Sequence, residues 1–297
     1  MRKIATLVTA VGVFFAGAVT TAHANTYAVT QATVTPTKAG TRANPKPVTI
    51  GFGYGVQPDA PGTRPTVTTD YVIGFGRQIK NNRNLWSSSR AIRSSAVMCT
   101  NAQAGLDTGQ APNCPAGSLA GKGVVKNQAG LVGSTAVAAN CNLGLRIAVG
   151  TGRVSTQFNN DGKRVRSDLL LLLQGSPNGV PGRPEVGSCP LTVNAALPAQ
   201  FTTVATGTAL SFHVPVSPFQ QPQSGIENAV VDVTSTLSKT VRVRTRVRRG
   251  GRTVTVIKRR GLLETRGCVG GSHRVNVAFT DKSGQTFNAG KTAPCRR

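Results

Sequence analysis

The chain has 297 residues, of which 35 are Lys or Arg and 10 are Asp or Glu, so its formal net charge is +25 at neutral pH. A surface this one-sided attracts polyanions and repels copies of itself, which bears on partners and solubility rather than on fold. Glycine (34 residues) and proline (17 residues) separate stretches rich in Val and Thr. No long segment carries apolar residues at helical spacing, so the composition argues against an all-α protein.

The first 24 residues have the pattern of an export signal. Met1-Arg2-Lys3 is a short positive start, residues 4–19 are mostly apolar, and Ala22-His23-Ala24 fits a small-x-small cleavage site. A membrane-spanning helix is the alternative, but the apolar run is short and ends in a cleavable motif. We therefore predict a Sec-type signal peptide over 1–24 and a protein that is secreted or held at the cell surface, with no transmembrane segment after cleavage. Loss of Arg2 and Lys3 lowers the net charge from +25 to +23.

Short strands separated by turns are predicted along the rest of the chain. They cover residues 27–35, 48–56, 66–79, 119–126, 141–149, 153–158, 169–173, 191–204, 208–216, 228–237, 273–279 and 286–289. The strands 141–149 and 153–158 flank Gly150-Thr151-Gly152 and read as a hairpin, and Asn159-Asn160-Asp161-Gly162 is a further turn. The five leucines 169–173 predict a central strand covered on both faces.

This pattern predicts an all-β fold for the secreted region 25–297. We expect a disulfide-bonded antiparallel β-sandwich, either one large sandwich or two packed ones, with a possible subdivision near 130–190.

Two features of the first half leave alternatives open. Gly51, Gly53 and Gly55 lack the spacing of a phosphate-binding loop and no helix follows, so we expect a curved strand against which something packs closely. Trp86, the only tryptophan, lies in a polar segment over 81–91. It could stack a sugar ring or a base, or it could plug an edge of the core.

Six cysteines remain after signal cleavage, and an even number in an exported chain predicts disulfides. About fifteen pairings are possible. The local order suggests that neighbours pair, as Cys99 with Cys114, Cys141 with Cys189, and Cys268 with Cys295. No C-x-x-C motif occurs, so neither a zinc knuckle nor a redox pair is expected, and we predict no metal site.

The stretch 240–260, TVRVRTRVRRGGRTVTVIKRR, predicts a hairpin that extends the core strand 228–237. Gly250-Gly251 lies between two alternating runs, which is typical of a two-residue primed turn. With the glycines at the turn, Val247 faces Val254 on one side and Arg246 faces Thr255 on the other. One face is then mostly Val and Thr, and the other is a ladder of arginines. The candidate polyanion-binding residues are Arg242, Arg244, Arg246, Arg248, Arg249, Arg252, Lys258, Arg259 and Arg260.

Short motifs resemble those of uncharacterised exported bacterial β-sandwich proteins, over most of the mature chain. They are Thr35-Pro36 with Lys38-Ala39-Gly40-Thr41 and Pro45, then Cys114-Pro115 with Ser118, Gly121 and Gly123, and at the end Cys268, Phe279-Thr280-Asp281 and Pro294-Cys295. The chain departs from the pattern by adding Cys141 and Cys189 and by a degenerate segment before Cys99. The resemblance implies fold and export, and it brings no activity.

Enzyme signatures are absent from the sequence: it has no G-x-S-x-G, H-E-x-x-H, S-x-x-K or EF-hand motif. His213 and His273 are the only histidines after cleavage, each within a predicted strand. Two carboxylates such as Glu227 and Asp232 could serve a glycosidase, but in so basic a protein we expect each to pair with Arg or Lys. We therefore predict a protein that is not an enzyme and needs no cofactor.

The function expected from the sequence is electrostatic contact with a polyanion. Side chains two apart on a strand repeat at about 7 Å, a spacing that suits successive charges on a linear polymer. An anionic wall polymer or an acidic polysaccharide is the expected partner, since export and the lack of interleaved aromatics argue against specific nucleic-acid binding. Three alternatives stay open: arginines that only prevent strand aggregation, a secreted polysaccharide-acting enzyme, and a structural surface or adhesion module. The sequence does not predict an oligomeric state.

Overall fold

The structure is a computed structural model that describes residues 25–106, 108, 110–158, 162–180 and 186–296. The signal peptide expected at 1–24 and the turn residues 159–161 lie outside these ranges. The described strands are β1 (Thr26–Thr35), β2 (Lys46–Pro47), β3 (Thr49–Gln57), β4 (Thr68–Gly74), β5 (Ile79–Asn81), β6 (Leu119–Leu131), β7 (Ala139–Val149), β8 (Val154–Phe158), β9 (Arg164–Arg166), β10 (Leu169–Ser176), β11 (Gly187–Ser188), β12 (Val193–Val204), β13 (Gly207–His213), β14 (Ile226–Leu237), β15 (Thr240–Arg249), β16 (Arg252–Gly261), β17 (Leu263–Thr265), β18 (Ser272–Asp281) and β19 (Thr286–Pro294). The described helical segments are single turns: η1 (Arg83–Leu85), η2 (Arg93–Ser95), η3 (Ala116–Ser118) and η4 (Val216–Gln220).

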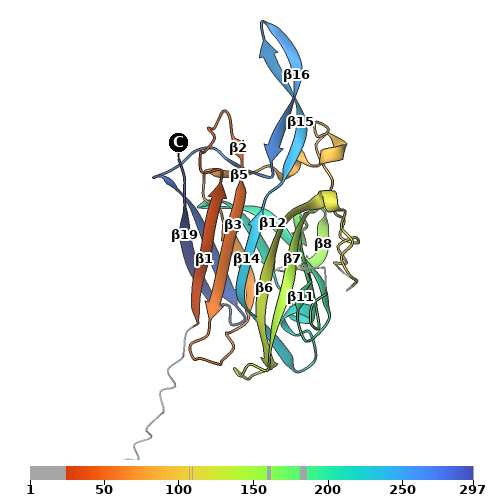
Figure 1. The fold of residues 1–297 in the computed structure, drawn as a ribbon, viewed down its shortest axis with the longest axis vertical. Coiled ribbons are helices and arrows are strands. Elements are labelled where there is room, and N and C mark those ends of the chain that lie inside the picture. The colour runs from red at the N-terminus through yellow and green to blue at the C-terminus, as the bar shows by residue number, and fades with distance from the viewer. Residues whose placement is uncertain (1–24, 107, 109, 159–161, 181–185, 297) are drawn as a thin grey trace, which may run out of the picture.

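One large antiparallel sheet forms the body. Its strand order is β1-β3-β14-β6-β7-β10-β12-β13-β4-β18-β19, with the short β11 beside β10 in parallel. The sheet folds over so that β1, β3, β14, β6 and β7 form one layer and the later strands of the order pass behind it (Figure 1). The fold class predicted from the sequence is confirmed.

The two ends of this strand order come back together, so the sheet is nearly closed. The Tyr27 ring on β1 stacks on the Phe287 ring on β19, with centroids 4.3 Å apart. Lys291 on β19 donates from Nζ to the Thr30 carbonyl oxygen on β1 at 2.7 Å. An aromatic stack and one lysine hydrogen bond therefore join β1 to β19. Backbone hydrogen bonds join the other neighbouring strands in this order.

The leucine strand β10 lies at the centre of the sheet, between β7 and β12, as predicted. Leu169, Leu171 and Leu173 belong to the main core between the layers, whereas Leu170 and Leu172 belong to a second cluster on the opposite face. That second cluster also contains Cys99 and Leu106 of the loop 99–114. A disulfide-closed loop, and not another sheet, therefore covers the outer face of β10.

The predicted hairpin of 141–149 with 153–158 is wrong. β7 pairs with β6 and β10, and β8 pairs with β9 instead. The chain turns away after β7 because the backbone N–H groups of Gly150 and Gly152 donate to the carbonyl oxygens of Asp168 and Ser167. The Asp168 carboxylate holds this crossing: it is fully buried and pairs with Arg83 and Arg166 at 2.8 and 2.7 Å.

The three expected disulfides are confirmed. Their Cα–Cα distances are 5.2 Å for Cys99–Cys114, 4.1 Å for Cys141–Cys189 and 5.8 Å for Cys268–Cys295. Each distance is at or near the range that a disulfide spans.

The glycines of β3 and the lone tryptophan have packing roles. A Cβ added to Gly53 would lie 2.7 Å from Oγ1 of Thr30, because side chains of β1 lie over the glycine row, as the sequence led us to expect. Trp86 is 3% exposed and belongs to the main core, which fits a core plug rather than an exposed ring ready to stack a ligand.

Candidate functional site: the basic hairpin

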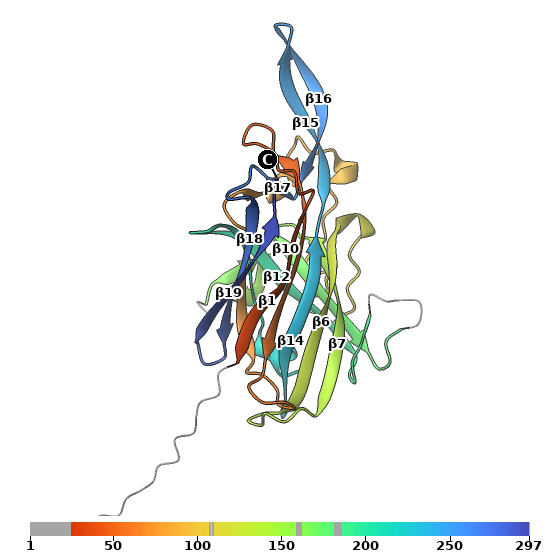
Figure 2. The ribbon, with the colours of Figure 1, turned by 60° about the vertical axis from the view of Figure 1, so that its left-hand side comes forward.

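The basic hairpin, defined here as β15 and β16 over residues 240–261, projects from one end of the body. Both views show its outer half clear of every other element (Figures 1 and 2). The predicted register is confirmed: Val247 pairs with Val254, and Arg246 pairs with Thr255. Gly250 and Gly251 have φ values of 52° and 77°, the two left-handed residues that a type I′ turn requires.

The inner half of the hairpin is fixed to the body. Val241 and Val243 are buried in the main core. The Ile92 backbone N–H donates to the Arg242 carbonyl oxygen at 2.9 Å, and the Arg244 N–H donates to the Arg90 carbonyl oxygen at 2.8 Å. The segment after η1 thus acts as a third strand against the base of β15, and it holds the direction in which the hairpin projects.

The predicted arginine ladder is exposed. The arginine side chains of β15 point to solvent, and Arg242 lies directly opposite Arg259, just as Arg249 lies opposite Arg252. Like charges facing each other across two strands are destabilising. The exposed basic residues of the hairpin without an ion pair to any described residue are Arg242, Arg244, Arg246, Arg248, Arg249, Arg252, Lys258 and Arg259.

Arg260 differs from the other predicted site residues. Its guanidinium donates from Nε and Nη2 to the two carboxylate oxygens of Glu264, at 2.8 and 2.7 Å. Glu264 is fully buried and also accepts from the Gly261 backbone N–H at 2.9 Å. Arg260 therefore anchors the base of the hairpin and is not available to a ligand.

Cations also lie close to one another at the base of the hairpin. Burial, followed by the nearby charges of Arg266 and Arg260, lowers the pKa of Lys80 on β5. A lysine whose proton is repelled by neighbouring guanidinium groups reports a local excess of cations.

The described side chains that could in principle carry metal or acid–base chemistry already have other partners. Sulfur atoms of Cys268 and Cys295 lie close to His273, but they form a disulfide with each other. Glu227 pairs with Arg64 and Lys282, each at 2.8 Å, and Asp232 pairs with Lys126 at 3.6 Å. The expected pairing of these carboxylates with cations is confirmed.

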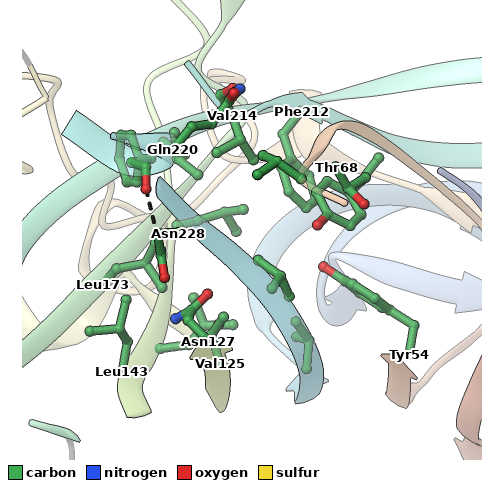
Figure 3. A pocket seen from close by; sticks show the side chains of 18 residues that line it. Tyr54, Thr68, Val125, Asn127, Leu143, Leu173, Phe212, Val214, Gln220 and Asn228 are labelled. Atoms are coloured by element: carbon green, nitrogen blue, oxygen red, sulfur yellow. Dashed lines mark hydrogen bonds between the residues drawn. The ribbon is translucent and has the colours of Figure 1, made fainter. Parts of the chain in front are cut away.

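An apolar cavity between the layers was not predicted from the sequence. Its inner part has a volume of about 70 Å³ and an outer part of about 190 Å³ adjoins it. Figure 3 shows Tyr54 and Thr68 on one side of the inner part, with Leu143 and Leu173 on the other. Phe219, in the Pro-rich segment 215–225 between two predicted strands, lines both parts, and nothing in that segment's sequence indicated a cavity.

Comparisons of this chain with family models, with curated proteins and with solved structures find no match. Among the described residues, no helix has the length and apolar character needed to cross a membrane.

Proposed function

We propose that this is a secreted, non-catalytic protein that binds polyanions of the cell envelope or its surroundings through the basic hairpin. The observation that carries the proposal is the projecting ribbon of cations, of which all but Arg260 have no acidic partner among the described residues. Residues 240–261 contain nine basic residues and no acidic one. Three disulfides are compatible with an oxidising, extracellular setting.

The arrangement of charge favours binding over mere protection of strand edges. Protection needs a charge at an exposed edge, whereas here arginines alternate along a whole face and face each other at Arg242 and Arg259. Such repulsion costs stability in the free protein, and a bound polyanion removes that cost. The guanidinium fork also suits bidentate contact with the carboxylate, sulfate or phosphate groups of such polymers.

The test is retention on immobilised heparin and on isolated cell envelope across a salt gradient. The variant replaces Arg242, Arg244, Arg246 and Arg248 by Thr, which suits an exposed strand. A matched control replaces four exposed arginines of the body by Thr: Arg42, Arg153, Arg274 and Arg296. Both variants lose the same net charge, so a difference between them measures the position of the charge and not its amount.

We expect the wild type to elute at high salt, the hairpin variant at much lower salt, and the control close to the wild type. Equal elution of the two variants would show that only net charge matters. Weak retention of the wild type at low salt would favour the alternative of a structural surface module.

A further inference from the structure

We infer that the cavity between the layers is a binding site for an uncharged, mainly aliphatic molecule that carries one hydroxyl or carbonyl group. This site is independent of the basic hairpin. Asn228, which lines both parts of the cavity, stands near the start of β14, and β14 reaches the hairpin only at its other end. No residue of the basic hairpin lines either part of the cavity, so the two sites share no side chain.

The two parts of the cavity form one path inward from the surface. They share Leu143, Phe219 and Asn228, so they meet at these side chains. The outer part reaches solvent beside Leu191, which is 41% exposed, and Pro222, which is also exposed. An apolar molecule thus meets apolar side chains at the entrance.

The η4 turn stands at the junction of the two parts. Phe219 is the residue of η4 that lines both, and its carbonyl oxygen accepts a hydrogen bond from Asn228 Nδ2 at 3.3 Å (Figure 3). Gln220, the next residue, donates from Nε2 to the Val214 carbonyl oxygen. These two hydrogen bonds hold the turn, so the junction is built into the fold.

The walls exclude a charged ligand. None of the residues that line either part is Asp, Glu, Lys, Arg or His. The two lining tyrosines are neutral, because burial raises the pKa of both Tyr54 and Tyr71. Burying an unpaired carboxylate or ammonium here would cost several kcal/mol, so a neutral ligand is strongly favoured.

Polar atoms at the inner end lack the hydrogen bonds that buried atoms normally make. Thr68 Oγ1 and the Tyr71 hydroxyl are both buried and interact with each other, but no hydrogen bond of ordinary geometry joins either of them to a described residue. Asn228 Oδ1, at the junction, is also buried without a partner. Each such atom costs about 1 to 3 kcal/mol. A ligand hydroxyl or carbonyl reaching them would recover part of that cost, as in pockets with apolar walls and a few polar groups.

The test is calorimetric titration of the full mature protein with octan-1-ol and, separately, with octanoate, which has the same chain length but a charged end. We expect saturable binding of one octan-1-ol per protein and binding of octanoate weaker by at least about tenfold. Absence of saturable octan-1-ol binding, or equal binding of octanoate, would overturn the inference.

Two variants locate the binding. Ala138→Phe fills the outer part from an exposed position, so it should fold and weaken octan-1-ol binding by at least about tenfold, which is about 1.4 kcal/mol. Ala136→Phe, also exposed but outside the lining, is the control and should bind like the wild type. Equal binding by Ala138→Phe would place octan-1-ol elsewhere and overturn the inference.

Thr68→Val tests the polar end of the ligand. It removes a buried hydroxyl that makes no hydrogen bond of ordinary geometry, at nearly constant volume, so the protein should be no less stable while octan-1-ol binding weakens about fivefold. A variant that binds octan-1-ol unchanged would show that Thr68 does not recognise the hydroxyl.

Discussion

The Arg260 guanidinium holds the buried Glu264 carboxylate in a two-point contact, with Nε–Oε1 and Nη2–Oε2 distances of 2.8 and 2.7 Å. Arg260 is the last charged residue of β16 and Glu264 is the middle residue of β17, which pairs with β2 and β5. This contact therefore joins the basic hairpin to the small sheet at its base. Asn82 adds to the junction by donating from Nδ2 to the Gly261 carbonyl oxygen at 3.0 Å.

Replacing Glu264 by Gln should destabilise the protein by about 2 to 3 kcal/mol. The fully buried amide cannot neutralise Arg260 and presents a donor toward its N–H groups. This loss of stability is smaller than the loss expected for a fully buried ion pair, because the Arg260 side chain is 27% exposed. Urea unfolding followed by Trp86 fluorescence measures it. Glu227→Gln is the comparison, and a loss below about 0.5 kcal/mol for Glu264→Gln would contradict the anchoring role.

Acidification should destabilise the protein in two separate pH ranges. Burial alone would raise the pKa of Glu227, but hydrogen bonds from Lys282 and Arg64 outweigh it and bring the net pKa below its ordinary value. The ionised Glu227 therefore stabilises the folded protein fully above about pH 4.3, and this stabilisation is lost as the pH falls through the folded-state pKa of Glu227. Burial lowers the pKa of His273, so the second loss begins as pH falls below about 6.5, where the unfolded state takes up the proton first.

The measurement is the free energy of unfolding from pH 8 down to pH 3. Each group contributes a slope of at most about 1.4 kcal/mol per pH unit. Glu227→Gln should flatten only the lower range and His273→Asn only the upper one. A single loss that both variants shift equally would mean that other groups control the acid response.

The parts of the fold that were predicted correctly are those encoded by residues close together in the sequence. The basic hairpin has a two-glycine turn between alternating strands, so its register follows from residues within about ten positions of Gly250 and Gly251. The leucine run of β10 is also a local feature, and each disulfide joins two cysteines that follow one another in the order of cysteines along the chain.

Long-range pairing was not accessible from the sequence. β14 lies between β3 and β6, and β4 lies between β13 and β18, although these strands are far apart along the chain. The cavity depends on that order, because Tyr54, Val125 and Phe212 meet only once their strands are placed. The false hairpin of 141–158 had the same cause: Gly150 and Gly152 donate to the carbonyl oxygens of Asp168 and Ser167, which come later in the chain.

Removing the Cys99–Cys114 disulfide should cost more than removing Cys268–Cys295. The first closes a loop with a sequence separation of 15, for which chain entropy alone gives about 3 kcal/mol, and the second, with a separation of 27, gains only about 0.5 kcal/mol more from this source. That loop also covers Leu170 and Leu172, so its opening should add about 2 kcal/mol of lost apolar burial. Urea unfolding of the Cys99→Ala/Cys114→Ala and Cys268→Ala/Cys295→Ala proteins compares them. An equal or smaller loss for the first pair would show that the loop stays in place without its disulfide.

Substitutions of Gly250 should alter the turn conformation of the basic hairpin without changing the stability of the body. A Cβ at this position meets no atom within 4 Å, so any effect of a substitution there comes from the φ of +52°. Valine in this region costs about 1 to 2 kcal/mol or more, whereas asparagine tolerates it and forms the Asn-Gly pair favoured in type I′ turns. We expect Gly250→Val to elute from heparin at lower salt than the wild type, while Gly250→Asn elutes with it. Thermal unfolding followed at Trp86 should be the same for all three, because Trp86 belongs to the main core. If Gly250→Val is retained like the wild type, the polyanion is recognised by charge on a flexible strand pair, and the ordered register of the hairpin plays no part in binding.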